Sequence, residues 1–270
     1  MTNAKIFCLC MQDDLLDKVN ILGYIPVGLG PNNFSDQWLT DATGDNISQK
    51  NAFYAEYTFH YWFWQNQLKL IKENEWIGFC TYRRFWQKKN KKIHKVLDFK
   101  SSILSEIPEE WKNYDVILGD RTYLNKIKWM KVIKYGKKAL WRNPGALLSK
   151  GRTIRFHFDM FHGNGVIDKA IELLNKNDKE DFKKFVNEQT SFNQTNMFIC
   201  KSKEIMQLYY KTVFEWLQKC EKVFGFNLVG YGNIRLYAFL AERFLPYWFH
   251  KNTKVLEWPI LFHDLRNEKI

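Results

Sequence analysis

Two adjacent arginines follow an apolar run of the kind that forms a buried strand. Residues 76–80 read Trp-Ile-Gly-Phe-Cys, and Tyr82, Arg83 and Arg84 come shortly after them. Open α/β sheets bind ligands at the carboxyl ends of their strands, and planar guanidinium groups grip phosphate oxygens with two parallel hydrogen bonds. These residues are therefore candidate ligands of a diphosphate. The alternative is that the arginines begin an ordinary solvated loop.

A carboxylate in an apolar helical segment is the first candidate for a general base. Glu242 has mostly apolar neighbours in the sequence, and a buried glutamate needs a partner or a raised pKa. A salt bridge to Arg243 or Arg235 is the structural alternative for Glu242. Asp159 and His162 are the second choice for the same role, although a histidine among aromatic residues is more often a hydrogen-bonded core residue.

The elements that must position these side chains follow one another in the order strand, helix, strand. Short apolar runs predict strands, and longer periodic runs predict helices. The predicted strands are 5–11, 24–30, 76–80, 114–119 and 194–201. The predicted helices are 52–72 with Asn51 as its N-cap, 165–174, 178–187, 203–224 and 234–248, the last ending near Pro246. This order predicts one α/β domain over residues 1–270, with a mostly parallel sheet flanked by helices.

The composition is that of a globular protein. Of the 270 residues, 46% are hydrophobic and 17% are aromatic, which is enough to build a large core. No apolar run approaches the length that spans a bilayer, and the first residues do not resemble a secretion signal. The five cysteines lie in apolar or helical runs and are expected to be reduced core residues. We therefore expect the protein to reside in the cytosol.

The positive charge is concentrated in one segment. The net charge is +12, and residues 121–158 contain eleven Lys or Arg and no Asp or Glu. Aromatic residues interleave with these cations, a combination that suits an anionic membrane surface. The residues assigned to this contact are Lys128, Trp129, Lys131, Lys134, Lys137, Lys138, Trp141 and Arg142.

Two other readings of the basic segment remain open. A solvated charged loop is the simplest, because most charge runs are solvated. A nucleic-acid-binding protein would also be basic, but no helix-turn-helix, zinc or RNA-binding signature accompanies the charge. A nuclease or phosphatase that uses Arg83 and Arg84 is a further alternative for the function of the chain. The lack of an acidic metal-binding cluster counts against it. We expect no nucleic-acid partner.

A series of short segments spans most of the chain. They are Tyr24-Ile-Pro-Val, Asp41-Ala-Thr-Gly-Asp-Asn-Ile-Ser48, Lys50-Asn51, Glu56, Tyr61-Trp-Phe-Trp-Gln-Asn66, Ile77-Gly-Phe-Cys-Thr-Tyr-Arg-Arg-Phe85, His162, Asn196-Met-Phe-Ile199, Arg235 and Ala241-Glu-Arg-Phe244. In their sequence and order these segments resemble a family of bacterial capsular and exopolysaccharide glycosyltransferases that is catalogued as a domain of unknown function. Thr81 departs from the pattern, in which a histidine precedes Tyr-Arg-Arg.

The resemblance implies a single-domain enzyme with a GT-A-like, Rossmann-type sheet. Its donor would be a nucleotide sugar, with UDP and a galactose or galactofuranose unit as the first choice. Its acceptor would be a lipid-linked glycan, presented at the inner membrane face to a peripherally bound enzyme. The stereochemistry of transfer stays open.

Small polar residues supply the remaining candidate contacts to the donor. Asp45, Asn46, Ser48 and Asn51 lie in a loop between two predicted elements, where they would bond the nucleoside or sugar. Their alternative role is to form turns or to cap the next helix. Asn196 and Arg235 belong to the same donor-binding set, and Asn196 could equally close a turn.

A metal is not required by this set of residues. Many GT-A enzymes hold a divalent metal through Asp-x-Asp, and this sequence has no such motif. We hypothesise that Arg83 and Arg84 supply the positive charge that a metal would otherwise provide. Binding of Mn²⁺ or Mg²⁺ is the alternative.

Overall fold

The computed structural model describes residues 4–88 and 99–267. The strands are β1 (Lys5–Cys10), β2 (Ile25–Gly28), β3 (Leu39–Thr40), β4 (Ile77–Thr81), β5 (Arg84–Trp86), β6 (Val116–Gly119), β7 (Arg121–Tyr123), β8 (Ser191–Asn193), β9 (Phe198–Cys200), β10 (Val255–Trp258) and β11 (Ile260–Phe262). The helices are α1 (Leu16–Leu22), α2 (Asn51–Tyr54), α3 (Tyr57–Trp62), α4 (Phe99–Ser102), α5 (Trp129–Tyr135), α6 (Lys137–Arg142), α7 (Ile154–His162), α8 (Val166–Ile171), α9 (Lys176–Glu188), α10 (Lys203–Phe224), α11 (Tyr231–Ile234) and α12 (Leu236–Asn252).

The predicted α/β fold with a mostly parallel sheet is confirmed. The central sheet has the strand order β10-β6-β9-β4-β1-β2-β3, and along this path only β9 runs in the opposite direction. From β1 the chain first adds β2 and β3 on one side, and it then returns to add β4 and later strands on the other side. The strand order therefore reverses between β1 and β4. That pair is the topological switch point, where open α/β sheets leave a crevice for ligands.

Each face of the sheet carries its own hydrophobic core, as the alternation of side chains along a strand requires. In β1, Phe7 and Leu9 point to the face covered by α3, α10 and α12. Ile6, Cys8 and Cys10 point to the opposite face, where they pack against residues of α1. All five cysteines are buried and none forms a disulfide, which confirms their predicted role as core residues.

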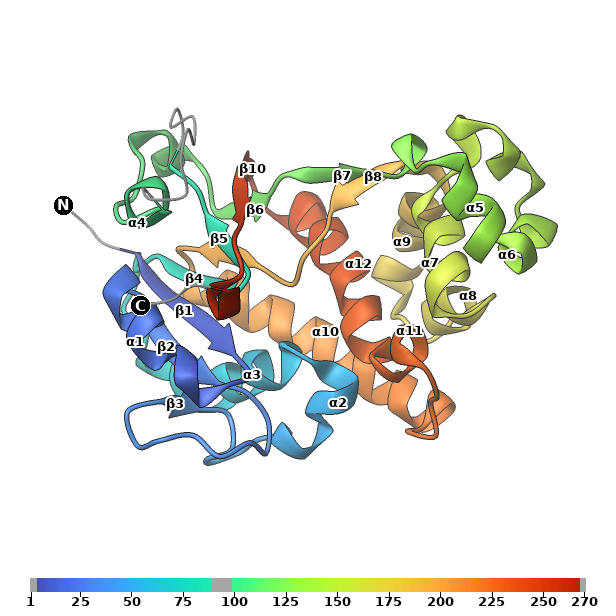
Figure 1. Ribbon diagram of the computed structural model, residues 1–270. Coiled ribbons are helices and arrows are strands. Elements are labelled where there is room, and N and C mark those ends of the chain that lie inside the picture. Colours follow the sequence, from blue (N-terminus) through green and yellow to red (C-terminus); the bar gives the residue numbers. More distant parts are fainter. Residues whose placement is uncertain (1–3, 89–98, 268–270) are drawn as a thin grey trace.

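A lobe built from α5 to α9 stands beside the sheet, with α11 and α12 between the two (Figure 1). Most of the basic segment folds here as α5, α6 and short turns, rather than as one extended loop. A small core attaches α5 and α6 to α7, and it contains Val132, Ala139, Ala146, Phe156 and Met160.

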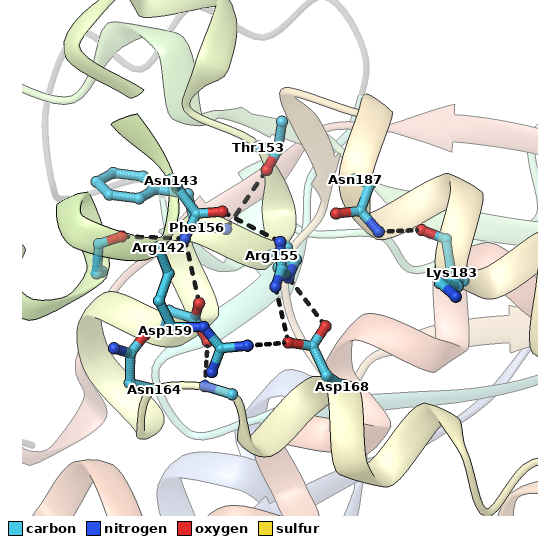
Figure 2. A network of polar contacts seen from close by, with 12 residues as sticks. Arg142, Asn143, Thr153, Arg155, Phe156, Asp159, Asn164, Asp168, Lys183 and Asn187 are labelled. Carbon is cyan, nitrogen blue, oxygen red and sulfur yellow. Dashed lines mark hydrogen bonds and ion pairs between the residues drawn. The ribbon is translucent and has the colours of Figure 1, made fainter. Parts of the chain in front are cut away.

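Ion pairs and hydrogen bonds reinforce that attachment (Figure 2). Asp168 on α8 accepts hydrogen bonds from Arg142 on α6 and from Arg155 on α7. Asn143 donates to Asp159 of α7 over 3.2 Å. The basic lobe is therefore firmly joined to the helix that, as described below, forms one wall of a cleft.

Two helix predictions were wrong. The predicted helix 52–72 is broken at Ala55, which has φ 47° and ψ −127°, and continues as α3 and then as π and 3₁₀ turns. Asn51 is the first residue of α2 rather than its N-cap. In the other case, α12 passes through Pro246 and ends at Asn252, so proline does not stop it. Within the described part of the chain, no helix combines the length and apolar character needed to cross a bilayer.

Candidate active site

A cleft opens above the carboxyl ends of β1 and β4. Its main cavity has a volume of about 590 Å³ and extends from the β4–β5 turn to α7 and α12. A smaller cavity of about 40 Å³ shares Glu56, Thr81 and Arg83 with it and reaches Leu9 and Met11 at the end of β1. The cleft therefore lies at the switch point of the sheet.

Four arginines line this cleft. Arg83 and Arg84 come from the β4–β5 turn, and Arg235 and Arg243 come from the start and middle of α12. The guanidinium of Arg83 lies 5.1 Å from the ring centre of Tyr82, and its buried Nε has no hydrogen-bond partner among the described residues. An unpartnered buried donor at the cleft wall is suited to an oxygen of a bound ligand. The structure thus brings Tyr82, Arg83, Arg84 and Arg235, four of the residues assigned to the donor, to one cleft.

Two carboxylates face these arginines. Glu56 precedes α3, at the break that Ala55 creates, and Glu242 projects from α12. Burial raises the pKa of Glu242, the positive charges of Arg243 and Arg84 lower it, and the negative charge of Glu56 raises it further. Glu242 therefore retains a proton at a higher pH than an exposed glutamate does, which is a property of catalytic acids and bases.

Arg243 organises the wall of the cleft around Glu242. Its guanidinium is buried, and it donates to Glu242 Oε2 and, over 3.2 Å, to the carbonyl oxygen of Phe239. It also donates to His157 Nδ1 at 3.2 Å and to His162 Nε2 at 3.3 Å. The salt bridge to Arg243, which was the structural alternative for Glu242, thus exists. Glu242 nevertheless still lines the cleft.

Both histidines are uncharged because guanidinium nitrogens only donate hydrogen bonds. The nitrogens that face Arg243 must therefore be acceptors, and His162 Nδ1–H donates to the carbonyl oxygen of Gly232 over 2.8 Å. Burial and the charge of Arg243 lower the pKa of His157 to about 3 and that of His162 to about 2.

The second-choice catalytic residues occupy different places. His162 lines the cleft, but both of its ring nitrogens are engaged. Asp159 is not among the residues lining the cleft, and it accepts hydrogen bonds from the backbone N–H of Gly165 at 2.8 Å and from Asn143 (Figure 2). Its position is that of a structural link between α6, α7 and α8.

Asn196 reaches the cleft from the turn before β9, which matches the turn-closing alternative and not the predicted strand 194–201. Its Oδ1 is buried and has no hydrogen-bond partner in the described part of the chain. The preceding Thr195 has φ 140°, which is unusual for a β-branched residue. Ala55 and Thr195 both combine positive φ with a place in the cleft wall, and strained backbone of this kind concentrates at functional sites.

The loop residues predicted to bind the donor divide into two groups. Asn51 lines the smaller cavity. Asp45, Asn46 and Ser48 are not among the residues lining either cavity. Asn46 Oδ1 accepts from the Ser48 hydroxyl at 2.8 Å, and Asp45 Oδ1 accepts from Tyr61 at 3.3 Å. The contacts of Asn46 and Ser48 match the turn-forming alternative, whereas the side chain of Asp45 joins the loop to α3.

Within residues 4–88 and 99–267, no three His, Cys, Asp or Glu side chains form a cluster suited to a metal ion. The two carboxylates of the cleft stand among arginines, which compete with a cation for the same oxygens.

The residues assigned to membrane contact are exposed, and Arg142 among them is also ion-paired. Trp129 is 41% exposed and Trp141 is 89% exposed. The lysines of α5 and α6 are exposed as well. Arg142, however, is engaged with Asp168 over 2.9 Å. Met130, which the sequence also places among these cations, is 81% exposed and adds to this surface.

The sequence reasoning also missed His157, Phe161 and Phe239 as cleft residues. His157 and Phe161 lie on α7 and Phe239 lies on α12, and nothing local predicts that these two helices meet. The one available signal was the density of aromatic and histidine residues between 155 and 162.

Comparisons with known proteins bear on the fold and the family. The family model described as "Domain of unknown function (DUF4422)" matches residues 5–253. No curated protein matches the chain. Among solved structures, the apo structure of the bifunctional glycosyltransferase WbbM is similar, with a TM-score of 0.66 and 22% sequence identity. The similarity covers 97% of this chain and 45% of the WbbM chain, so this chain spans about half of that protein's length. The two share a fold.

Proposed function

The chain belongs to the DUF4422 family, and we propose that it is a glycosyltransferase that moves a sugar from a nucleotide diphosphate to a glycan. The observation that supports this function most strongly is the arginine cluster at the switch point of the sheet, opposite a carboxylate with a raised pKa. A departing diphosphate needs positive charge, and an attacking hydroxyl needs a base. The cleft offers both, on a fold shared with a known glycosyltransferase.

The donor would lie with its diphosphate against Arg83 and Arg84. Its nucleoside, for which uridine is our choice, would extend over the ends of β1 and β4, past Tyr82 and Asn51. Its sugar would occupy the main cavity, where the unpartnered Oδ1 of Asn196 accepts a hydrogen bond from a hydroxyl group. A galactose or galactofuranose unit is our proposal for that sugar.

In the transfer step, an acceptor hydroxyl attacks the anomeric carbon while the bond to the diphosphate oxygen breaks. Glu242 takes the proton of the hydroxyl, and the arginines stabilise the charge that develops on the leaving diphosphate. This assignment corresponds to direct displacement. We propose that the arginines make a divalent metal dispensable.

The acceptor in this proposal is a lipid-linked glycan of capsule or surface-polysaccharide assembly. An enzyme acting on it works at the inner face of the membrane and binds there peripherally. The lysines and exposed aromatic residues of α5 and α6 would provide that contact.

Removal of either guanidinium should weaken nucleotide binding. We expect Arg83→Ala and Arg84→Ala each to reduce the affinity for UDP by about 10- to 100-fold, because a charge-assisted hydrogen bond contributes about 1.5–3 kcal/mol. Isothermal titration with UDP measures this. Lys150→Ala, which removes an exposed cation from the lobe, is the control.

The same titration, together with an assay of sugar transfer, tests the role of a metal when both are run in excess EDTA. We expect unchanged affinity for UDP and unchanged transfer of sugar from a UDP-sugar. Complete loss of transfer in EDTA, restored by Mn²⁺ or Mg²⁺, would refute the arginine clamp as a substitute for metal. Tight binding of nucleic acid without binding of UDP would refute the proposed function.

A further inference from the structure

A row of aromatic rings leads from the cleft to the basic lobe. The ring of Phe239 stacks on His162 with 3.8 Å between centres and an interplanar angle of 26°. Phe161 follows at 6.3 Å from His162, and Tyr135 follows at 5.8 Å from Phe161. His157 lies beside the row, 5.1 Å from Phe161. The row joins α12, α7 and α5.

The outer rings of this row are accessible. Phe161 is 36% exposed and also lines the cleft, and Tyr135 is 50% exposed. Phe239, His162 and His157 line the cleft at the inner end. A large molecule bound in the cleft would therefore meet Phe161 and then Tyr135 on its way out.

The rings of the inner part of the row are uncharged, and the Arg243 guanidinium that contacts them is paired with a carboxylate. Arg243 takes the lone pairs of both imidazoles and keeps the two histidines neutral, and its own charge is compensated by Glu242. The arginines that could hold a diphosphate, Arg83 and Arg84, lie instead at the β4–β5 turn. The cleft thus has a cationic region and a neutral aromatic region. Aromatic faces combined with neutral hydrogen-bonding groups suit ligands that have both apolar and hydroxyl surfaces.

The outer rings of the row lie on helices that pack against one another. Gly136 follows Tyr135, and a Cβ at Gly136 would lie 2.6 Å from the Val132 carbonyl oxygen and 3.2 Å from Met160 Sδ. Asp168 ties both α6 and α7 to α8 (Figure 2). Tyr135 and Phe161 are therefore preorganised, which lowers the entropic cost of binding a ligand along them.

We propose that Tyr135, Phe161, His162 and Phe239 form an extended acceptor subsite for consecutive sugars of a neutral oligosaccharide. The proposal rests on the glycosyltransferase function proposed above and adds to it the length and charge of the acceptor. The acceptor's non-reducing end occupies the main cavity, and the sugars behind it stack on Phe161 and Tyr135. These two outer rings are positioning residues for the acceptor.

The test is binding of neutral galacto- and gluco-oligosaccharides, one to six sugars long, to the full chain. We expect affinity to rise with length up to three or four sugars. Phe161→Ala and Tyr135→Ala should each lower the affinity for the longer chains by about five- to tenfold and leave that for a monosaccharide unchanged. Tyr123→Ala is a matched control, because Tyr123 is also 50% exposed and also has a lysine over its ring.

Binding of UDP is measured in parallel on every variant. If UDP binds but no oligosaccharide binds better with length, or if Tyr135→Ala and Phe161→Ala behave like Tyr123→Ala, the extended subsite is refuted and the proposed function stands. If the unaltered chain fails to bind UDP, the proposed function is refuted together with the inference that rests on it.

Discussion

Charge in the cleft is balanced among a few side chains. Arg243 is buried among the rings of Phe158, Phe192 and Phe239, at 5.2–5.8 Å from their centres, which is a costly place for a cation unless it is paired. Glu242 supplies the pair, and the two histidines and the Phe239 carbonyl oxygen accept further hydrogen bonds. The arrangement fixes the direction of the carboxylate, and burial at the same time raises its pKa.

The Glu242→Gln change should lower turnover by about 10²- to 10⁴-fold with little effect on UDP affinity, because it removes the proton acceptor but preserves the shape. The unaltered enzyme should lose activity as the pH falls through the raised pKa of Glu242, since only the ionised carboxylate accepts a proton. That acidic limb should be absent from the residual activity of the variant. A pH profile of kcat measures both effects.

Glu215→Gln, on the exposed side of α10, is the control for this change. If Glu242→Gln kept most of its turnover and its acidic limb, the assignment of Glu242 as the base would be wrong, and direct displacement would have to be abandoned with it.

At the scale of elements, the break between α2 and α3 places Glu56 in the cleft. Asn51 donates to the carbonyl oxygen of Ala55 and to the Thr58 hydroxyl, both over 3.0 Å, and Thr58 donates to the same carbonyl over 3.0 Å. Buried Asp41 accepts from the Gly30 N–H at 2.7 Å beside them. These bonds hold Ala55 at φ 47°, a conformation that costs about 1–3 kcal/mol for a residue with a side chain.

Replacing Ala55 by glycine should therefore stabilise the protein. Relief of the backbone strain outweighs the greater flexibility of glycine in the unfolded chain, so we expect the free energy of unfolding to rise by about 1 kcal/mol. Urea denaturation measures it. Ala52→Gly, in the exposed part of α2, is the control and should lower stability by up to about 1 kcal/mol. Equal losses in both variants would show that Ala55 is not strained.

At the scale of the whole molecule, the sheet and the lobe divide the work of the proposed enzyme. The sheet carries Arg83 and Arg84, and the lobe carries the exposed lysines together with apolar side chains. Met130, Trp141 and Leu148 are 81%, 89% and 72% exposed, which is unusual for residues of this size. Because α7 contributes both to the lobe and to the cleft wall, a surface bound by the lobe would be held at a set distance from the cleft.

The chain should sediment with vesicles that contain anionic lipid and not with neutral phosphatidylcholine vesicles. Binding should weaken as salt rises, and Lys131→Glu with Lys138→Glu should reduce it by tenfold or more, since each cation near the surface contributes about 1 kcal/mol. Trp141→Ser should reduce vesicle binding by a smaller factor than the lysine changes, and it should leave the salt dependence of binding unaltered. Leu208→Ser, at a residue 54% exposed on α10, is the control.

Binding that is indifferent to salt and to the lysine changes would rule out this contact. A filter assay with single- and double-stranded nucleic acid separates the membrane from the other polyanion that a basic surface attracts.

Local patterns predicted the strands at the centre of the sheet and the tip that carries Arg83 and Arg84. Short apolar runs such as 76–80 are recognisable because a strand buried on both faces must be apolar throughout. The 22 residues of α10 matched their prediction because amphipathic periodicity is a local signal. The placement of Arg83 and Arg84 at the cleft followed from strand direction alone.

Contacts between distant segments made the rest of the site. His157 and Arg243 are 86 residues apart in the chain, and their hydrogen bond depends on α7 packing near α12. The break at Ala55 also escaped prediction, because alanine favours a helix. Asn51 and Thr58 bond to the Ala55 carbonyl oxygen from within the same segment, and buried Asp41 lies beside them. The composition and hydrophobic periodicity of a segment indicate which of its side chains face water. A cleft, in contrast, forms where several distant segments pack together.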